Sequence, residues 1–159
     1  MKGSEGFTLI ELIIVLALVA IITSVAFPTF LSQRSETKLK DAVSMIRGDL
    51  EMARSRAIRE NAAVPILVRS DGYTIFVDNG SDGGTAENWV QDGGERQLCS
   101  RALPGGIRID LSQVTFDSTR TRFNGRGYVE NSGTMAIVNA EGKSITLDLN
   151  NRFGRITTY

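Results

Sequence analysis

Glu11 is the residue whose chemistry is most out of place in this chain of 159 residues. It stands at the head of an apolar run, and no charged residue follows it between positions 12 and 33. A carboxylate inside a bilayer costs about 2.5–3.5 kcal/mol, unless it finds a cation or faces other protein. One interpretation places Glu11 at the headgroup boundary. The other gives it an amine partner, which cleavage between Gly6 and Phe7 would create as a new α-amino group.

Few other residues have the chemistry of an active site or a metal centre. The chain has no histidine, the usual general base and the commonest metal ligand. Its single cysteine, Cys99, has no partner for an intramolecular disulfide. We expect Cys99 to be a buried small apolar side chain, with pairing to another chain as the alternative. There is no phosphate-binding loop and no recognisable nucleophile motif, so we expect neither enzymatic activity nor a cofactor.

The apolar run after Glu11 predicts a membrane-spanning helix. About 20 apolar residues match a hydrocarbon core of roughly 30 Å. A secretory signal peptide is the alternative, but it needs a basic head, a shorter apolar core and a cleavage site after that core. Phe27 and Pro28 directly follow the small residues and disfavour such a site. Basic residues on both sides, Lys2 before the run and Arg34 after it, leave the orientation open.

The N-terminal stretch KGSEGFTLIELIIVLALVAIIT resembles the class III signal of type IV pilins and type II secretion pseudopilins. The match joins a short polar leader to Gly6, Phe7, Thr8, Leu9 and Glu11, followed by the apolar run. In that family, prepilin peptidase cuts after the glycine and methylates the new amine. The resemblance therefore implies processing at Gly6 and Phe7, and pairing of Glu11 with the amine of a neighbouring subunit. Pro28 matches a position where the family's helix bends or loosens in the filament, because proline removes a helix donor.

Residues 34–61 predict a continuation of the same helix with an amphipathic pattern. Apolar side chains recur at steps of three and four residues, which places them on one face. They are Leu39, Val43, Ile46, Leu50, Ala53 and Ala57. Glu36 and Lys40 have the spacing of an ion pair along a helix. A coiled coil is the alternative, but a sustained pattern of flanking charges is missing.

Residues 62–159 predict an antiparallel β domain. Asp71-Gly72 marks one hairpin, a turn near Gly142 marks a second, and Ile107, Ile109 and Leu111 alternate as in a half-buried strand. The expected fold class is α+β, with a long N-terminal helix, transmembrane and then amphipathic, packed on an antiparallel β-sandwich-like domain. The expected divisions are a leader at 1–6, a transmembrane or filament-core helix at 7–33, an amphipathic helix at 34–61 and the periplasmic domain at 62–159.

A glycine-rich acidic loop runs from Asp78 to Glu95. A calcium-binding loop is one interpretation, but Trp89 stands where the EF-hand pattern needs a carboxylate. We therefore favour a surface loop. Trp89, the single tryptophan, either anchors this loop or is exposed for a partner.

The downstream segments ARSRAIREN, LPGGIRI, FNGRG and FGRITTY resemble H-type minor pseudopilins and FimT-type minor pilins. The latter bind DNA through a C-terminal GRxR-like stretch. Here Thr157 stands where the second arginine belongs, and one lost phosphate contact lowers the salt slope of binding by about one unit. The candidate DNA contacts are Arg126, Arg152 and Arg155. Scattered, solvated arginines are the alternative, and the net charge of zero gives no global reason to bind nucleic acid.

These features predict a non-enzymatic minor pilin or pseudopilin of a type II secretion pseudopilus or a type IV pilus. It would sit in the bacterial inner membrane by a single span, with its C-terminal domain in the periplasm, and assemble near the filament tip. Its expected partners are other pilin or pseudopilin subunits, prepilin peptidase and inner-membrane lipid. A DNA-binding minor pilin in natural transformation is the alternative.

Overall fold

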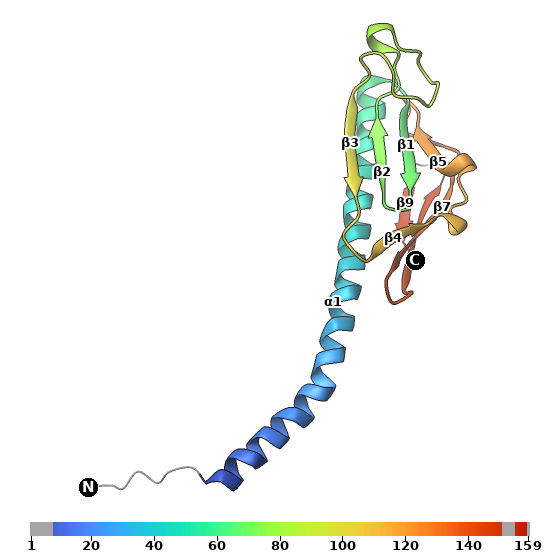
Figure 1. Cartoon of the computed structure of the whole chain (residues 1–159). Helices are drawn as coiled ribbons and strands as arrows, with labels where there is room; N and C mark the ends of the chain where they lie inside the picture. The colour runs from blue at the N-terminus through green and yellow to red at the C-terminus, as the bar shows by residue number, and fades with distance from the viewer. Residues whose placement is uncertain (1–7, 151–154, 159) are drawn as a thin grey trace. The chain divides into compact units, whose positions relative to one another are not determined.

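The computed structural model describes residues 8–150 and 155–158, without the side chains of residues 25–32, 150, 155 and 156. The chain divides into two compact units, Met1–Arg34 and Ser35–Tyr159, and each is described by itself. One helix, α1 (Leu9–Glu60), supplies residues to both units (Figure 1).

Side chains and backbone turns mark the two ends of α1. The Thr8 hydroxyl accepts a hydrogen bond from the Glu11 amide at 3.2 Å, as a helix N-cap does. At the other end Asn61 adopts a left-handed backbone conformation with φ of 47°, which asparagine tolerates well. The amides of Asn61 and Ala62 then donate to the carbonyls of Ile58 and Ala57, so the last turn is closed.

The amphipathic pattern of α1 within Ser35–Tyr159 is confirmed. All six apolar residues predicted to share one face are buried. They are Leu39, Val43, Ile46, Leu50, Ala53 and Ala57, and they share one core cluster with residues of both β-sheets. The predicted ion pair along the helix is present, with 2.9 Å between Lys40 Nζ and Glu36 Oε1.

Two antiparallel sheets form the rest of this unit (Figure 1). The first has the strand order β3-β2-β1-β5-β6 and the second β4-β7-β8-β9. The strands are β1 (Val64–Arg69), β2 (Gly72–Phe76), β3 (Gln97–Ala102), β4 (Ile107–Asp110), β5 (Arg120–Phe123), β6 (Val129–Glu130), β7 (Gly133–Asn139), β8 (Ser144–Asn150) and β9 (Arg155–Thr158). The predicted α+β fold class, a helix packed on an antiparallel domain, is confirmed.

The strand predictions are confirmed for the two hairpins, but the predicted strand that begins at Ile107 ends earlier than expected. The β1–β2 and β7–β8 hairpins turn where expected, beside Asp71 and Gly142. Ile107 and Ile109 are buried as predicted, but Leu111 is 41 % exposed and starts a 3-10 turn. The Asp110 side chain accepts the Ser112 amide at 3.1 Å and so ends the strand before Leu111 can join it.

A polar clasp joins the turn between β7 and β8 to the start of α1 in this unit. Lys143 Nζ lies 2.9 Å from Glu36 Oε2, and the Asn139 side-chain amide donates to the Ser35 hydroxyl at 3.1 Å. Hydrogen bonds from Lys143 and then from Lys40 lower the pKa of Glu36 to about 2. The clasp therefore contains a carboxylate that stays charged in mildly acidic solution.

Candidate functional site

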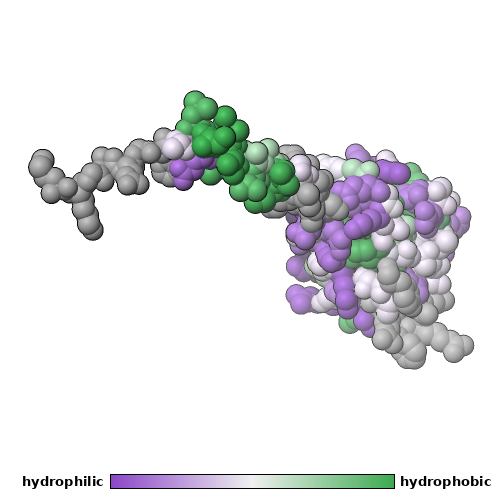
Figure 2. Space-filling model, turned by 90° about the horizontal axis from the view of Figure 1, so that it is seen from below, coloured by the Kyte–Doolittle hydropathy of each residue, from purple (hydrophilic) through white to green (hydrophobic). Residues whose placement is uncertain are grey.

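The first candidate site is the apolar stretch of α1 at residues 9–22. Its large apolar side chains are half to three-quarters exposed, and Figure 2 shows them gathered along this part of the helix. They are Leu9, Ile10, Leu12, Ile13, Ile14, Val15, Leu16, Leu18, Val19, Ile21 and Ile22. Exposed apolar surface of this extent marks a membrane-binding or protein-binding surface.

Two hydroxyl side chains directly after this stretch are satisfied by the helix itself. The Thr23 hydroxyl donates to the Val19 carbonyl and the Ser24 hydroxyl to the Ile21 carbonyl, both at 2.7 Å. These hydroxyls therefore need no water, which suits apolar surroundings. In the part of the chain whose placement is described, no helix is both long enough and apolar enough to cross a membrane. The predicted span continues through residues 25–32, Pro28 among them, whose side chains lie outside the described set.

Glu11 is exposed at the start of the apolar stretch. Among the described residues its carboxylate has no ion-pair partner. Gly6 and Phe7, the predicted processing site, lie outside the described residues. Pairing of Glu11 with an amine of another subunit therefore stays a prediction.

Of the three predicted DNA contacts, only Arg126 has a described side chain. Arg126 is exposed on the turn between β5 and β6. Arg155 begins β9 but its side chain is not described, and Arg152 lies outside the described residues. A DNA-binding patch of these three arginines stays a prediction.

Two other arginines hold the loop of residues 78–95. The guanidinium carbons of Arg120 and Arg122 lie 4.8 and 4.5 Å from the centre of the Trp89 ring, within cation–π distance. The buried Asp78 carboxylate accepts the amides of Glu87 and Trp89, two residues with positive φ. Of the two interpretations of Trp89, anchoring of the loop is therefore the one that the structure supports. Spacing gave no signal for this role of Asp78, because the carboxylate satisfies backbone amides nine and eleven residues away.

Cys99 is less buried than predicted. It lies half-buried on the edge strand β3, with its sulfur 3.8 Å from an oxygen of Asp49 on α1. Burial, followed by the negative charge of Asp49, raises the pKa of the Cys99 thiol to about 11. The thiol is therefore protonated at neutral pH and a poor nucleophile.

An exposed apolar helical stretch that continues into an amphipathic helix on an antiparallel domain is the architecture of pilin-like proteins. The chain belongs to the family described as type II transport protein GspH, whose family model matches residues 42–154. A second family model, the prokaryotic N-terminal methylation motif, matches residues 1–27. The resemblance to H-type and FimT-type minor pilins is confirmed at the level of the family.

Solved structures with this fold include three minor pilins or pseudopilins. The minor pseudopilin EpsH of the Vibrio cholerae type 2 secretion system has a TM-score of 0.55 at 12% identity, over 77% of this chain and 96% of that one. Escherichia coli GspH has a TM-score of 0.57 at 17% identity, over 77% and 88%. The Pseudomonas aeruginosa type IV minor pilin FimU has a TM-score of 0.55 at 20% identity, over 81% and 92%. At these identities the likeness shows the fold.

A fimbrial protein of Pseudomonas aeruginosa is 38% identical over 64 residues. The match spans 40% of this chain and 41% of that protein, so it covers well under half of either.

Proposed function

We propose that this chain is a minor pilin or pseudopilin, a structural subunit of a type II secretion pseudopilus or a type IV pilus. One observation carries the proposal. Helix α1 buries one face against the β domain, and its residues 9–22 carry large exposed apolar side chains that no other described residue covers. Membership of the GspH family and the match to the N-terminal methylation motif support it.

The proposed steps of cleavage, methylation, membrane anchoring and assembly all involve the N-terminal segment. Prepilin peptidase cuts after Gly6 and methylates the amine of Phe7, and the apolar stretch anchors the precursor in the inner membrane with the β domain in the periplasm. The match of residues 1–27 to the N-terminal methylation motif supports the methylation step. Assembly then transfers the stretch from lipid to a filament core near the tip, an exchange between two apolar environments that costs little.

Pairing of Glu11 stabilises the assembled subunit relative to the subunit that waits in the membrane. A carboxylate among packed helices is strongly disfavoured unless it is paired. The amine of Phe7 on a neighbouring subunit supplies the partner, and the pairing fixes the axial offset between the two helices. The chain then acts by packing rather than by catalysis, and its partners are other subunits of the filament.

Substitution of Glu11 tests the proposal. We expect Glu11→Gln to leave the chain in the membrane fraction but to reduce its recovery in sheared filaments by about tenfold or more, because the pairing charge is lost. Glu51→Gln is the matched control, since Glu51 is also an exposed glutamate of α1. Quantitative immunoblots of both fractions give the measurement. Recovery of Glu11→Gln in filaments at the wild-type level would remove the pairing role.

A further inference from the structure

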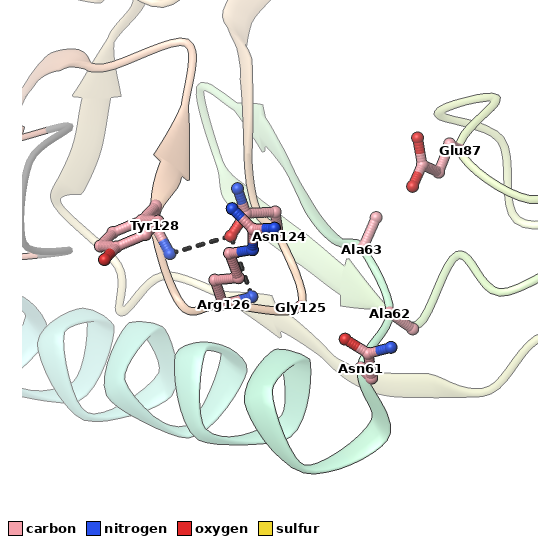
Figure 3. Close-up of a pocket in the computed structure, with 8 residues that line it drawn as sticks. All are labelled: Asn61, Ala62, Ala63, Glu87, Asn124, Gly125, Arg126 and Tyr128. Carbon is pink, nitrogen blue, oxygen red and sulfur yellow. Dashed lines mark hydrogen bonds between the residues drawn. The ribbon is translucent and has the colours of Figure 1, made fainter.

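An open pocket of about 340 Å³ lies beside the C-terminal end of α1 (Figure 3). Asn61 lines it from the turn after the helix, and Asn124, Arg126 and Tyr128 line it from the β5–β6 turn. Glu87, from the loop of residues 78–95, lines the side away from Arg126. All of these residues belong to Ser35–Tyr159, so the pocket does not involve the apolar stretch at residues 9–22.

The β5–β6 turn is held in place before any ligand arrives. The side-chain oxygen of Asn124 accepts the amides of Arg126 and Tyr128, both at 3.1 Å. From the helix, Arg54 Nε donates to the Gly127 carbonyl at 3.2 Å. A wall fixed in this way loses little conformational entropy when it binds a ligand.

Two functional groups of this wall are unused among the described residues. The Arg126 guanidinium is exposed and makes no ion pair or side-chain hydrogen bond there. The Tyr128 side chain is 44 % exposed, and its hydroxyl makes no hydrogen bond there. Nearby Arg122, by contrast, contacts Glu130, the Trp89 ring and both the carboxylate and the carbonyl of Glu87. Arg126 is thus a cation on the pocket wall with no ion-pair partner among the described residues, whereas the acidic lining residue Glu87 lies 3.9 Å from Arg122.

We propose that this pocket binds an acidic side chain on an extended segment of a partner protein. The planar guanidinium of Arg126 suits a carboxylate, which it can bind through two parallel hydrogen bonds. The Tyr128 ring offers a rigid apolar surface with a polar tip for the rest of the segment. The Glu87 side chain is 68 % exposed, and although one carboxylate oxygen lies 3.9 Å from Arg122, the other can accept a backbone amide of the same segment.

The charges around the pocket favour a peptide over nucleic acid. A nucleic-acid strand carries a phosphate at every nucleotide and needs several cations along its path. Among its described lining residues this pocket offers one arginine, Arg126, and the nearby Arg122 is already paired with Glu130 and Glu87. A peptide with a single carboxylate meets the cation and leaves Glu87 facing an N–H donor. The proposal does not depend on filament assembly.

Nuclear magnetic resonance of the labelled full chain in detergent micelles tests the proposal. The probe is an acetylated, amidated alanine pentapeptide with glutamate at its centre, compared with its glutamine counterpart. We expect the glutamate peptide to shift the amides of Arg126 and Tyr128 in a saturable way. The glutamine peptide should bind about tenfold more weakly or not at all, because it lacks the charge.

Arg126→Gln should weaken binding of the glutamate peptide by about tenfold. Arg108→Gln is the matched control, because Arg108 is an exposed arginine on β4 and should leave binding unchanged. The absence of saturable shifts up to about 10 mM peptide, the level of negligible affinity, would overturn the proposal. Equal binding by Arg126→Gln would do the same. So would shifts at these amides with inorganic phosphate or a thymidine oligonucleotide but not with the peptide.

Discussion

The Asp49 carboxylate on α1 accepts a hydrogen bond of 2.7 Å from the Tyr73 hydroxyl on β2. The same oxygen binds Arg101 Nε on the edge strand β3 at 3.0 Å. Burial, and then the hydrogen bond to Asp49, raises the pKa of Tyr73 far above its ordinary value. One carboxylate oxygen of the helix therefore joins two strands of the first sheet, and the tyrosine hydroxyl stays protonated as its donor.

Removal of this carboxylate should destabilise the domain. We expect Asp49→Ala to lower the free energy of unfolding by about 1–3 kcal/mol, because the buried Tyr73 hydroxyl loses its acceptor. Tyr73→Phe removes the donor as well as the need for an acceptor, and should cost about 1 kcal/mol or less. Denaturant unfolding of the full chain in micelles measures both. Asp41→Ala, an exposed aspartate on the same helix, is the control, and an equal effect at positions 41 and 49 would argue against the bridge.

The clasp between α1 and the β7–β8 turn should make stability depend on pH. Because hydrogen bonds from Lys143 and Lys40 lower the pKa of Glu36 from 4.5 to about 2, its contribution to stability is complete above pH 4.5 and is lost as the pH falls toward 2. We expect the melting temperature of wild type to exceed that of Glu36→Gln at neutral pH. This difference should disappear as the pH falls from 4.5 to 2. Melting curves across this range give the measurement.

Salt provides an independent check on the same clasp. Since Glu36 and Lys143 are solvent-accessible, added salt should reduce the difference in melting temperature between wild type and Glu36→Gln at neutral pH. Glu51→Gln, elsewhere on the exposed surface of α1, is the control and should show no such dependence. A difference for Glu36→Gln that stays constant from neutral pH to pH 2 would contradict the assignment.

Two glycines with left-handed backbones should differ in their tolerance of a side chain. Gly127 has φ of +77°, and a Cβ there would lie 2.6 Å from Ile58 Cδ1. Gly142 has φ of +82° and open space around it. We expect Gly142→Ala to cost about 1 kcal/mol from backbone strain alone, and Gly127→Ala to cost more, because the end of the exposed Ile58 side chain has to move aside.

The double variant Gly127→Ala with Ile58→Ala separates the clash from the strain. Ile58 is 50 % exposed, so its own truncation should cost little. The pair should therefore be less destabilised than the sum of the single changes, as unfolding free energies would show. Strict additivity would mean that Gly127→Ala acts through its backbone alone.

The buried helix face and the two hairpins could be predicted from the sequence because their signals are local. The buried face of α1 follows from spacings of three and four residues, and the hairpins follow from turn residues between β-rich runs. The end of β4 could not be predicted from alternation, because the Asp110 side chain accepts the amide of Ser112. This local hydrogen bond competes with continued strand pairing.

The polar contacts could not be predicted because they join residues far apart in the sequence. Asp49 lies 24 residues from Tyr73 and 52 from Arg101, and no periodicity links such positions. The same holds for the pocket, where Asn61, Glu87 and Arg126 come from three separate segments. Processing at Gly6 and Phe7 stays a prediction that rests on the resemblance to a family. Pairing of Glu11 stays a prediction as well, because the proposed partner is an amine of another subunit.

Mass spectrometry of the chain purified from the membranes of bacteria that carry prepilin peptidase tests most directly whether it is a processed filament subunit. The proposed function predicts a mature chain whose first residue is N-methylated Phe7, with residues 1–6 absent. The same sample from cells without the peptidase should retain the uncut chain. Recovery of an intact chain that begins at Met1 from peptidase-containing cells would contradict the proposal.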